Sequence, residues 1–173
     1  MRRPPSFLDL AELYDSHAQA LFGFLLNFMR DEEDTQDVLQ EVFLRIGRRP
    51  ELLDGVRDRR GFLIRLSHNL AIDLMRRRTT REKTLERVRF ESIPLFASSS
   101  DPDENAFRMA LSEAMGELPP DQRAVVHLKL WEGLTFDAIA EVLGVSLNTA
   151  ASRYRYGIDK LRHHLRPLYD EIK

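Results

Sequence analysis

Apolar residues recur at intervals of three and four along most of the chain, which is the spacing of amphipathic helices. Residues 7–29 follow this spacing, and the acidic run DEED after them suits the start of a second helix, where the helix dipole favours negative charge. The second helix carries one apolar stripe, formed by Leu39, Val42, Phe43 and Ile46. A third helix is predicted from about residue 60 to residue 78. No segment shows the two-residue alternation of a strand, so the pattern predicts an all-α fold.

The helical pattern is interrupted at residues 91–105, where the sequence is ESIPLFASSSDPDEN. Two prolines, a serine run and four acids are typical of a flexible linker. Further helices are predicted after it, at about residues 104–115, 121–131, 136–143 and 147–165. We therefore expect two small helical domains, residues 1–90 and 106–173, joined by a flexible acidic linker.

Composition narrows the classes of function. The chain has 173 residues, of which 43% are hydrophobic and 31% charged, as in a globular protein. It has no cysteine, which excludes disulfides and thiolate metal sites. The longest apolar stretch, LFGFLLNFM, is too short to cross a bilayer, and no apolar signal-peptide core follows the basic N-terminus. No nucleophile motif, phosphate loop or metal-ligand cluster is recognisable, so we expect no catalytic site, cofactor or metal.

The net charge of −2, taken alone, argues against nucleic-acid binding. The charge is unevenly distributed, however, because residues 91–117 are acidic and the parts before and after them are mildly basic. The local charge of each half is therefore the relevant quantity.

The stretch TFDAIAEVLGVSLNTAASRYRYGIDKLR, residues 135–162, has the arrangement of a helix-turn-helix. Thr135 and Ser146 are each placed to cap a helix, and Gly144 suits the left-handed turn that ends the first helix. Helical spacing turns five residues of the second helix inward: Leu147, Ala150, Tyr154, Ile158 and Leu161. Its outward residues are Asn148, Thr149, Ala151, Ser152, Arg153, Arg155 and Tyr156. Amides, hydroxyls and guanidinium groups bind base edges and phosphates, which favours DNA binding over an αα-hairpin with a solvated face.

Two features of the N-terminal half are candidate binding surfaces. In residues 34–45, Leu44 lies outside the apolar stripe among acidic and amide side chains, which suits a protein partner or a solvated face with a stray leucine. The other feature is the basic run at residues 76–89, which follows an arginine-containing loop and a helix with Asn69 and Asp73 one turn apart. A basic surface of this kind suits single-stranded DNA, although many charge runs are simply solvated.

With both halves considered, the chain resembles the small extracytoplasmic-function (ECF) members of the sigma-70 family, over about residues 14–165. The first similar segment is DEEDTQDVLQEVFLRI, which resembles the family's core-polymerase-binding helix with its D-x-x-Q-E-x-F pattern. The second is FLIRLSHNLAIDLMRRR, which resembles the helix that handles the −10 promoter element, with N-x-x-x-D-x-x-R. The third, residues 117–162, resembles domain σ4, which begins with L-P-x-x-Q-R. The matching positions are Asp37, Gln40, Glu41 and Phe43; Asn69, Asp73 and Arg76; and Leu118, Pro119, Gln122, Arg123, Thr149, Ser152 and Arg153.

The resemblance implies a transcription initiation factor that is not an enzyme and that acts in the cytoplasm without a cofactor, a metal or membrane insertion. It implies a σ2-like domain at residues 1–90, a linker at 91–105 and a σ4-like helix-turn-helix domain at 106–173. The implied partners are the largest subunits of core RNA polymerase, promoter DNA and a controlling anti-sigma factor.

The resemblance also implies roles for individual residues. Core polymerase binding is implied for Asp37, Gln40, Glu41 and Leu44. Contact with the −10 element is implied for Arg57, Arg59, Arg60, Arg65, Asn69, Asp73, Arg76 and Arg77. Contact with the −35 element is implied for Ser146, Asn148, Thr149, Ser152, Arg153 and Arg155.

Three positions depart from the family pattern. Phe62 stands where the family often has tryptophan, and both residues fill an apolar site. His68 stands where arginine is frequent, which removes an expected phosphate contact at neutral pH. Ala151 stands where many members have lysine, which removes an expected −35 contact.

Two other classes of protein fit the sequence less well. A transcription regulator that uses a σ4-like helix-turn-helix without polymerase would lack the motifs at residues 37–43 and 69–76. A recombinase with a helical DNA-binding tail would need a nucleophile and a carboxylate site. His127, within VVHLKL, is predicted to be a core or half-buried residue rather than a base.

Overall fold

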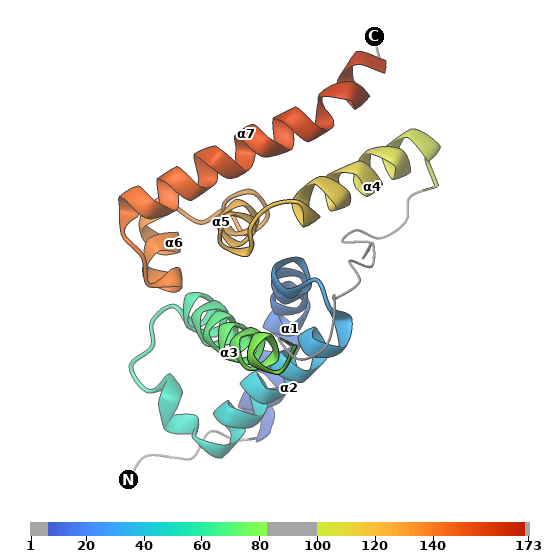
Figure 1. Cartoon of the computed structure of the whole chain (residues 1–173). Helices are drawn as coiled ribbons and strands as arrows, with labels where there is room; N and C mark the ends of the chain where they lie inside the picture. Colours follow the sequence, from blue (N-terminus) through green and yellow to red (C-terminus); the bar gives the residue numbers. More distant parts are fainter. Residues whose placement is uncertain (1–6, 83–99, 172–173) are drawn as a thin grey trace. The chain divides into compact units, whose positions relative to one another are not determined.

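The structure is a computed structural model that describes residues 7–82 and 100–171 (Figure 1). These two ranges contain seven α-helices, one short 3-10 helix and no strand, which confirms the predicted all-α fold. The elements are α1 (Phe7–Met29), α2 (Glu32–Arg48), η1 (Pro50–Leu53), α3 (Arg59–Glu82), α4 (Pro102–Gly116), α5 (Pro120–Leu130), α6 (Phe136–Leu143) and α7 (Leu147–Glu171). None of the helices in the described ranges has the length and apolar character needed to span a membrane.

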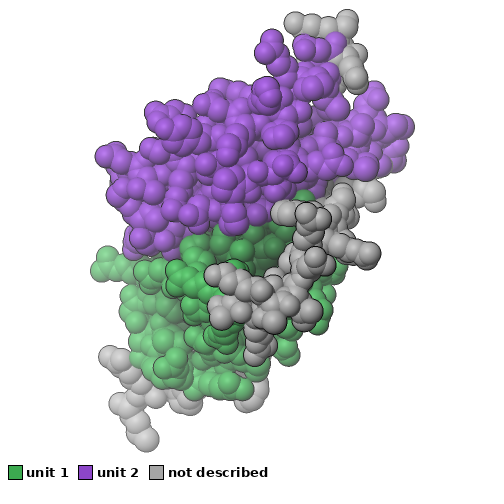
Figure 2. All heavy atoms as spheres, in the orientation of Figure 1, with its two compact units in different colours: residues 1–88 green, residues 89–173 purple. Residues whose placement is uncertain are grey.

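The chain divides into two compact units, unit 1 at residues 1–88 and unit 2 at residues 89–173 (Figure 2). Most of the predicted linker, residues 91–99, lies outside the described residues. Its last residues are helical rather than extended, because α4 already begins at Pro102. The Asp101 side chain accepts a hydrogen bond from the backbone N–H of Asp103 at 3.0 Å, and proline is favoured in the first turn.

Unit 1 is formed by α1, α2 and α3, which pack against one another. Its largest fully buried side chains are Phe24, Leu25, Val42 and Leu63. The apolar stripe predicted for α2 is buried as expected. Two contacts set the pairing of α1 with α2. The Tyr14 ring meets the Phe43 ring edge-on at 4.8 Å, and Leu10 lies 3.3 Å from the position that a Cβ on Gly47 would occupy.

Unit 2 is organised around α7, which contacts α4, α5 and α6. Figure 1 shows its start beside α6, its middle crossing α5 and its end beside α4. One core cluster joins α4, α5 and α7 and comprises Ala114, Met115, Leu118, Val126, Leu161 and Leu165. Helix α7 extends beyond the predicted end at residue 165 and continues through Pro167. The sequence pattern predicted that this helix ends at Leu165, before Pro167, whereas in the structure it continues to Glu171.

The crossing of α5 and α7 is close because Gly157 has no side chain. A Cβ placed on Gly157 would lie 2.7 Å from Cγ2 of Val126 and 3.6 Å from the backbone oxygen of Gln122. Val126 is fully buried, so it has no free space into which to move. The first turns of α5 therefore lie directly against the middle of α7.

Replacement of Gly157 by alanine should destabilise unit 2, because there is no room for a methyl group at the crossing. We expect Gly157→Ala to lower the free energy of unfolding by about 1–3 kcal/mol, because the core must shift to admit the new atom. Gly23→Ala is the matched control, since a Cβ on this α1 glycine would meet nothing within 4 Å. That change should leave stability unchanged or raise it by up to about 1 kcal/mol. Calorimetric unfolding of both variants tests this, and equal effects would contradict the crossing geometry.

Candidate nucleic-acid and polymerase interfaces

The helix-turn-helix in unit 2 has the three local features that the sequence predicted. The Thr135 side chain accepts a hydrogen bond from the backbone N–H of Ala138 at 3.2 Å and so caps α6. Gly144 adopts the left-handed conformation, with φ 65° and ψ 38°. The Ser146 hydroxyl accepts a hydrogen bond from the backbone N–H of Thr149 at 3.1 Å at the start of α7. These interactions satisfy backbone groups that a helix end leaves unpaired and define where α7 begins.

Aromatic and cationic contacts join α5, α6 and α7 within the helix-turn-helix. The Phe136 ring meets the Tyr154 ring edge-on at 5.4 Å, and the ammonium group of Lys129 lies 4.8 Å from the Phe136 centroid. The same ammonium group donates a hydrogen bond to the backbone oxygen of Leu134 at 3.1 Å. Phe136 thus links α6 to both α5 and α7.

The inward face of α7 largely follows the prediction. Ala150 and Leu161 are buried, and Tyr154 and Ile158 pack against the core while partly exposed. The expectation that Leu147 is buried is wrong, because its side chain is 47% exposed. Leu147 is the first residue of α7, so no preceding turn of the helix covers it.

The outward face of α7 is polar, but its residues differ in exposure. Asn148 and Arg155 are exposed, while Thr149 and Ser152 are half-buried. The guanidinium of Arg155 lies over the Tyr156 ring, 5.2 Å from its centroid. Ala151 is half-buried, like Thr149 and Ser152.

Arg153 is held by a residue that the sequence analysis did not single out. Its Nη2 lies 2.8 Å from Oδ2 of Asp121, in the first turn of α5. Arg153 is half-buried, and Asp121 is exposed. Nothing in the linear sequence pairs these two residues, because the pairing depends on how α7 crosses α5.

The candidate polymerase-binding residues of unit 1 lie together on one face of α2. Their positions, 37, 40, 41 and 44, have the three- and four-residue spacing of neighbours on a helix surface. Leu44 is 43% exposed, Asp37 and Gln40 are exposed, and Glu41 pairs with Nε of Arg45 at 2.8 Å. The predicted exposed leucine among acidic and amide groups is therefore present. Phe43, the last residue of the motif, is buried and supports this face from below.

The candidate −10 residues of unit 1 are all exposed. They are Arg57, Arg59, Arg60, Arg65, Asn69, Asp73, Arg76 and Arg77. The carboxylate of Asp58 accepts a hydrogen bond from the backbone N–H of Gly61 at 3.0 Å and so anchors the loop to the start of α3. The guanidinium of Arg65 lies 5.9 Å from the Phe62 ring centroid. The structure thus places a basic loop directly before a helix with polar side chains spaced along it.

Arg78, in the same arginine run, forms ion pairs within unit 1. Its guanidinium pairs with the buried carboxylate of Asp34, and its Nη1 lies 3.8 Å from Oδ2 of Asp31. Asp31 also caps α2, because its carboxylate accepts a hydrogen bond from the backbone N–H of Asp34 at 2.8 Å. Burial and, after it, the Asp31 charge raise the pKa of Asp34 to about 6, and Arg78 offsets only part of this. Arg78 thus joins the later part of α3 to the start of α2.

Two histidines are core residues. His68 is 5% exposed and lies against Phe24 and Phe28, with ring centroids 6.4 and 5.0 Å away. The side chain therefore lies in the core of unit 1 and not on its surface. His127 is buried and stacks on Trp131 at 5.3 Å, which confirms its prediction as a core residue.

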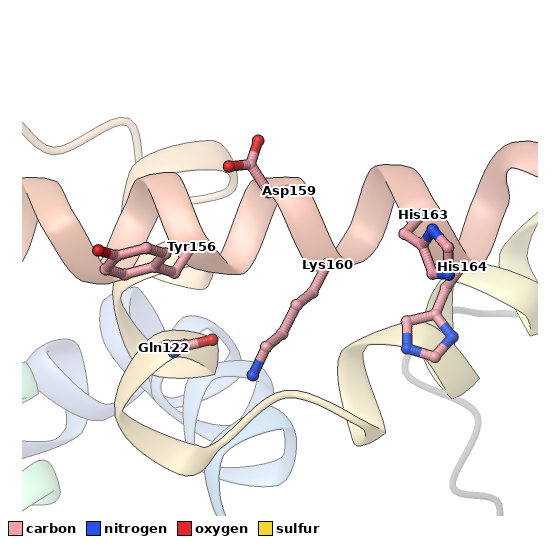
Figure 3. A pocket seen from close by; sticks show the side chains of 6 residues that line it. All are labelled: Gln122, Tyr156, Asp159, Lys160, His163 and His164. Atoms are coloured by element: carbon pink, nitrogen blue, oxygen red, sulfur yellow. The ribbon is translucent and has the colours of Figure 1, made fainter.

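A shallow cavity of about 470 Å³ lies beside α7 in unit 2. Figure 3 shows its lining residues, which are Gln122 of α5 and Tyr156, Asp159, Lys160, His163 and His164 of α7. Among the residues that the structure describes, no three histidine, aspartate or glutamate side chains are grouped so that they could hold a metal ion.

The fold is helical, and its helix-turn-helix unit is joined to a second unit that carries acidic residues on α2 and a basic loop before α3. Comparison with known proteins identifies the family. Residues 13–81 match the family model described as Sigma-70 region 2, and residues 108–161 match Sigma-70, region 4.

Two relatives are similar over almost the whole chain. The ECF RNA polymerase sigma factor SigL of Mycobacterium tuberculosis is 32% identical over 160 residues, which cover 90% of this chain and 88% of SigL. The ECF RNA polymerase sigma factor SigX of Bacillus subtilis is 27% identical over 165 residues, which cover 92% of this chain and 85% of SigX. The chain belongs to the sigma-70 family and, within it, to the ECF sigma factors. It is a transcription initiation factor and not an enzyme.

A solved structure has the same fold. The sigma factor RpoE from Bartonella quintana, solved in complex with the anti-sigma factor NepR, matches with a TM-score of 0.76. The match covers 91% of this chain and 97% of that chain at 19% sequence identity.

The buried carboxylate of Asp34 makes the stability of the protein depend on pH. The folded state retains this proton up to a pH of about 6, whereas an unfolded aspartate loses it near its ordinary pKa, 3.8. The stabilisation from the bound proton is therefore complete below about pH 4 and is lost as the pH rises through 6. Over this window the free energy of unfolding of the wild type should fall by up to about 3 kcal/mol more than that of Asp34→Asn.

Urea denaturation at a series of pH values measures this difference. Asp15→Asn, which changes an exposed aspartate on α1, is the control and should follow the wild-type profile. Parallel profiles for the wild type and Asp34→Asn would show that Asp34 titrates normally.

Proposed function

We propose that this protein binds core RNA polymerase through α2 and directs it to promoters, with unit 1 handling the −10 element and unit 2 the −35 element. The observation that carries the proposal is the capped helix-turn-helix, whose α7 presents a polar outward face. The functional boundaries are residues 1–90 for the first activity, 91–105 for a linker and 106–173 for the second. The protein acts in the cytoplasm, where core polymerase and promoter DNA are present.

Recognition of the −35 element is assigned to the first turns of α7. A helix of this kind enters the major groove with its N-terminal residues nearest the bases. We assign Asn148, Thr149, Ser152 and Arg153 to contacts with base edges and Arg155 to a contact with a phosphate. Ser146 sets the start of the helix, and its hydroxyl lies 2.8 Å from that of Thr149.

Binding to core polymerase is assigned to the α2 face. Leu44 supplies exposed apolar area, and Asp37, Gln40 and Glu41 supply polar contacts around it. An apolar centre with a polar rim is the usual composition of a protein–protein interface. Arg45 holds Glu41 in one orientation, so less side-chain freedom is lost when the partner binds.

Handling of the −10 element is assigned to the basic loop and the exposed side of α3. Arg57, Arg59 and Arg60 contact the phosphates of a single strand, and Asn69 and Asp73 supply polar contacts to its bases. Arg65, Arg76 and Arg77 extend the basic surface along α3. Extraction of a base from the duplex costs a few kcal/mol, which these contacts and stacking must offset.

Control by an anti-sigma factor is part of the proposal. The fold match to RpoE, whose structure was solved with the anti-sigma factor NepR, supports this kind of partner. Such a protein would compete with core polymerase or DNA for the surfaces described above.

The α2 face should be needed for core polymerase binding. We expect Gln40→Ala combined with Glu41→Ala to reduce co-purification with core polymerase and to reduce transcription, since two polar contacts at the interface are lost. The control is Glu12→Ala with Gln19→Ala, which removes the same residue types from exposed positions on α1. Transcription by core polymerase plus each protein, with sequencing of start sites, reports on activity and reveals the promoters. Normal co-purification of the α2 variant would remove this face from the proposal.

Arg153 should contribute to recognition of the −35 element. We expect Arg153→Ala to weaken promoter binding by about 1–3 kcal/mol if the side chain reads a base. Arg162→Ala is the control, since Arg162 is an exposed arginine farther along the same helix. The measurement is holoenzyme affinity for promoter fragments found by start-site sequencing. Equal affinities for the two variants would exclude Arg153 from −35 recognition.

A further inference from the structure

We infer that Asp121, on α5, is a positioning residue for promoter recognition: it orients the guanidinium of Arg153 at the edge of the α7 face that meets the −35 element. The inference rests on the proposed role of α7. It adds a specificity-determining residue that lies outside the recognition helix.

The position of Arg153 on α7 makes an orienting partner important. Arg153 comes one turn after Ala150 and one turn before Gly157, and both of these residues are buried. Its side chain therefore leaves the helix at the boundary between the buried face and the outward face. An arginine at such a boundary has many rotamers available, and only some of them extend toward a base.

The ion pair with Asp121 favours one of these rotamers. Its Oδ2 lies 2.8 Å from Nη2 of Arg153, and the Arg153 side chain is only 28% exposed in this arrangement. A guanidinium has five N–H donors, so a contact with one carboxylate oxygen leaves others for a base edge. A side chain that is already oriented loses less freedom when it binds.

The backbone of α5 beside Asp121 is held in place by the packing of α5 on α7. The next residue, Gln122, has its backbone oxygen 3.6 Å from the position of a Cβ on Gly157, and Val126 fills the remaining space at the crossing. Asp121 also lies in the first turn of α5, where the helix dipole favours a negative charge. The two partners thus stand on helices whose separation at this point is fixed by close contact.

The ion pair is not explained by stability alone. The Asp121 side chain is 55% exposed, and exposed ion pairs contribute little to folding. The other arginine of the outward face, Arg155, lies over the Tyr156 ring, and within residues 7–82 and 100–171 no carboxylate pairs with it. Asp121 thus pairs with Arg153, which is assigned to bases, and not with Arg155, which is assigned to a phosphate.

The test compares Asp121→Asn with Asp137→Asn. Asp137 lies in the first turn of α6 and is exposed, so its change alters the charge of unit 2 equally without touching Arg153. Holoenzyme formed from core polymerase and each full-length variant is bound to two DNA fragments. One is the promoter with the most start sites in the transcription experiment, and the other is the same fragment with its −35 element scrambled.

We expect Asp121→Asn to reduce the ratio of affinities for the two fragments by about fivefold or more, as loss of a well-oriented arginine contact would. Asp137→Asn should keep the wild-type ratio. In the Arg153→Ala background, Asp121→Asn should produce no further loss, since the residue that it orients is absent. Melting temperatures of the two asparagine variants should stay within a few degrees of the wild type.

An unchanged ratio of affinities in Asp121→Asn would overturn the inference. If both affinities rise by the same factor, the residue has a general charge effect. If only the melting temperature falls, the residue has a purely structural role. A wild-type ratio in Arg153→Ala would instead remove Arg153 from the proposed function, which is a different failure from that of Asp121.

Discussion

The crossing of α7 over α5 at Gly157 and Val126 is the contact on which the position of α7, the helix proposed to meet DNA, depends. Because no side chain separates the helices at this point, the first turn of α5 comes close enough for Asp121 to reach Arg153. The caps supplied by Thr135 and Ser146 then determine where α6 and α7 begin. The packing at Gly157 sets the position of α7, and the Ser146 cap sets which residues form its first turns. A recognition helix needs both, since a small rotation would present different side chains to the groove.

Unit 1 depends in a similar way on contacts beneath its surfaces. Phe43 is buried against Tyr14, and the exposed residues of α2 lie around it. Arg78 joins α3 to the start of α2 through Asp34, whose pKa is raised to about 6 by burial and by Asp31. Charged residues that look alike in the sequence thus serve different purposes. Arg76 and Arg77 are exposed, while Arg78 pairs with Asp34 and so links α3 to α2.

Much of the fold was predictable from local signals. Helical spacing located the helices, and the acidic run after α1 coincided with the capped start of α2. Gly144 was predictable because few residues other than glycine adopt the left-handed conformation easily. The exposed Leu44 was predictable because helical spacing excluded it from the apolar stripe of α2. The burial of His68 was not predictable, because it depends on which neighbouring helices cover the position. The exposure of Leu147 follows instead from its place as the first residue of α7.

The sequence by itself determined the helices, their caps, the turn of the helix-turn-helix and the motifs that mark the chain as an ECF sigma factor. These properties depend on residues within one or two helical turns of each other, so linear spacing is sufficient to show them. Only the tertiary structure decided that Asp121 meets Arg153 and that Arg78 pairs with Asp34. Each of these depends on the angle and separation at which two helices cross. That geometry is set by the packing of many side chains together and is not encoded in any short stretch of the chain.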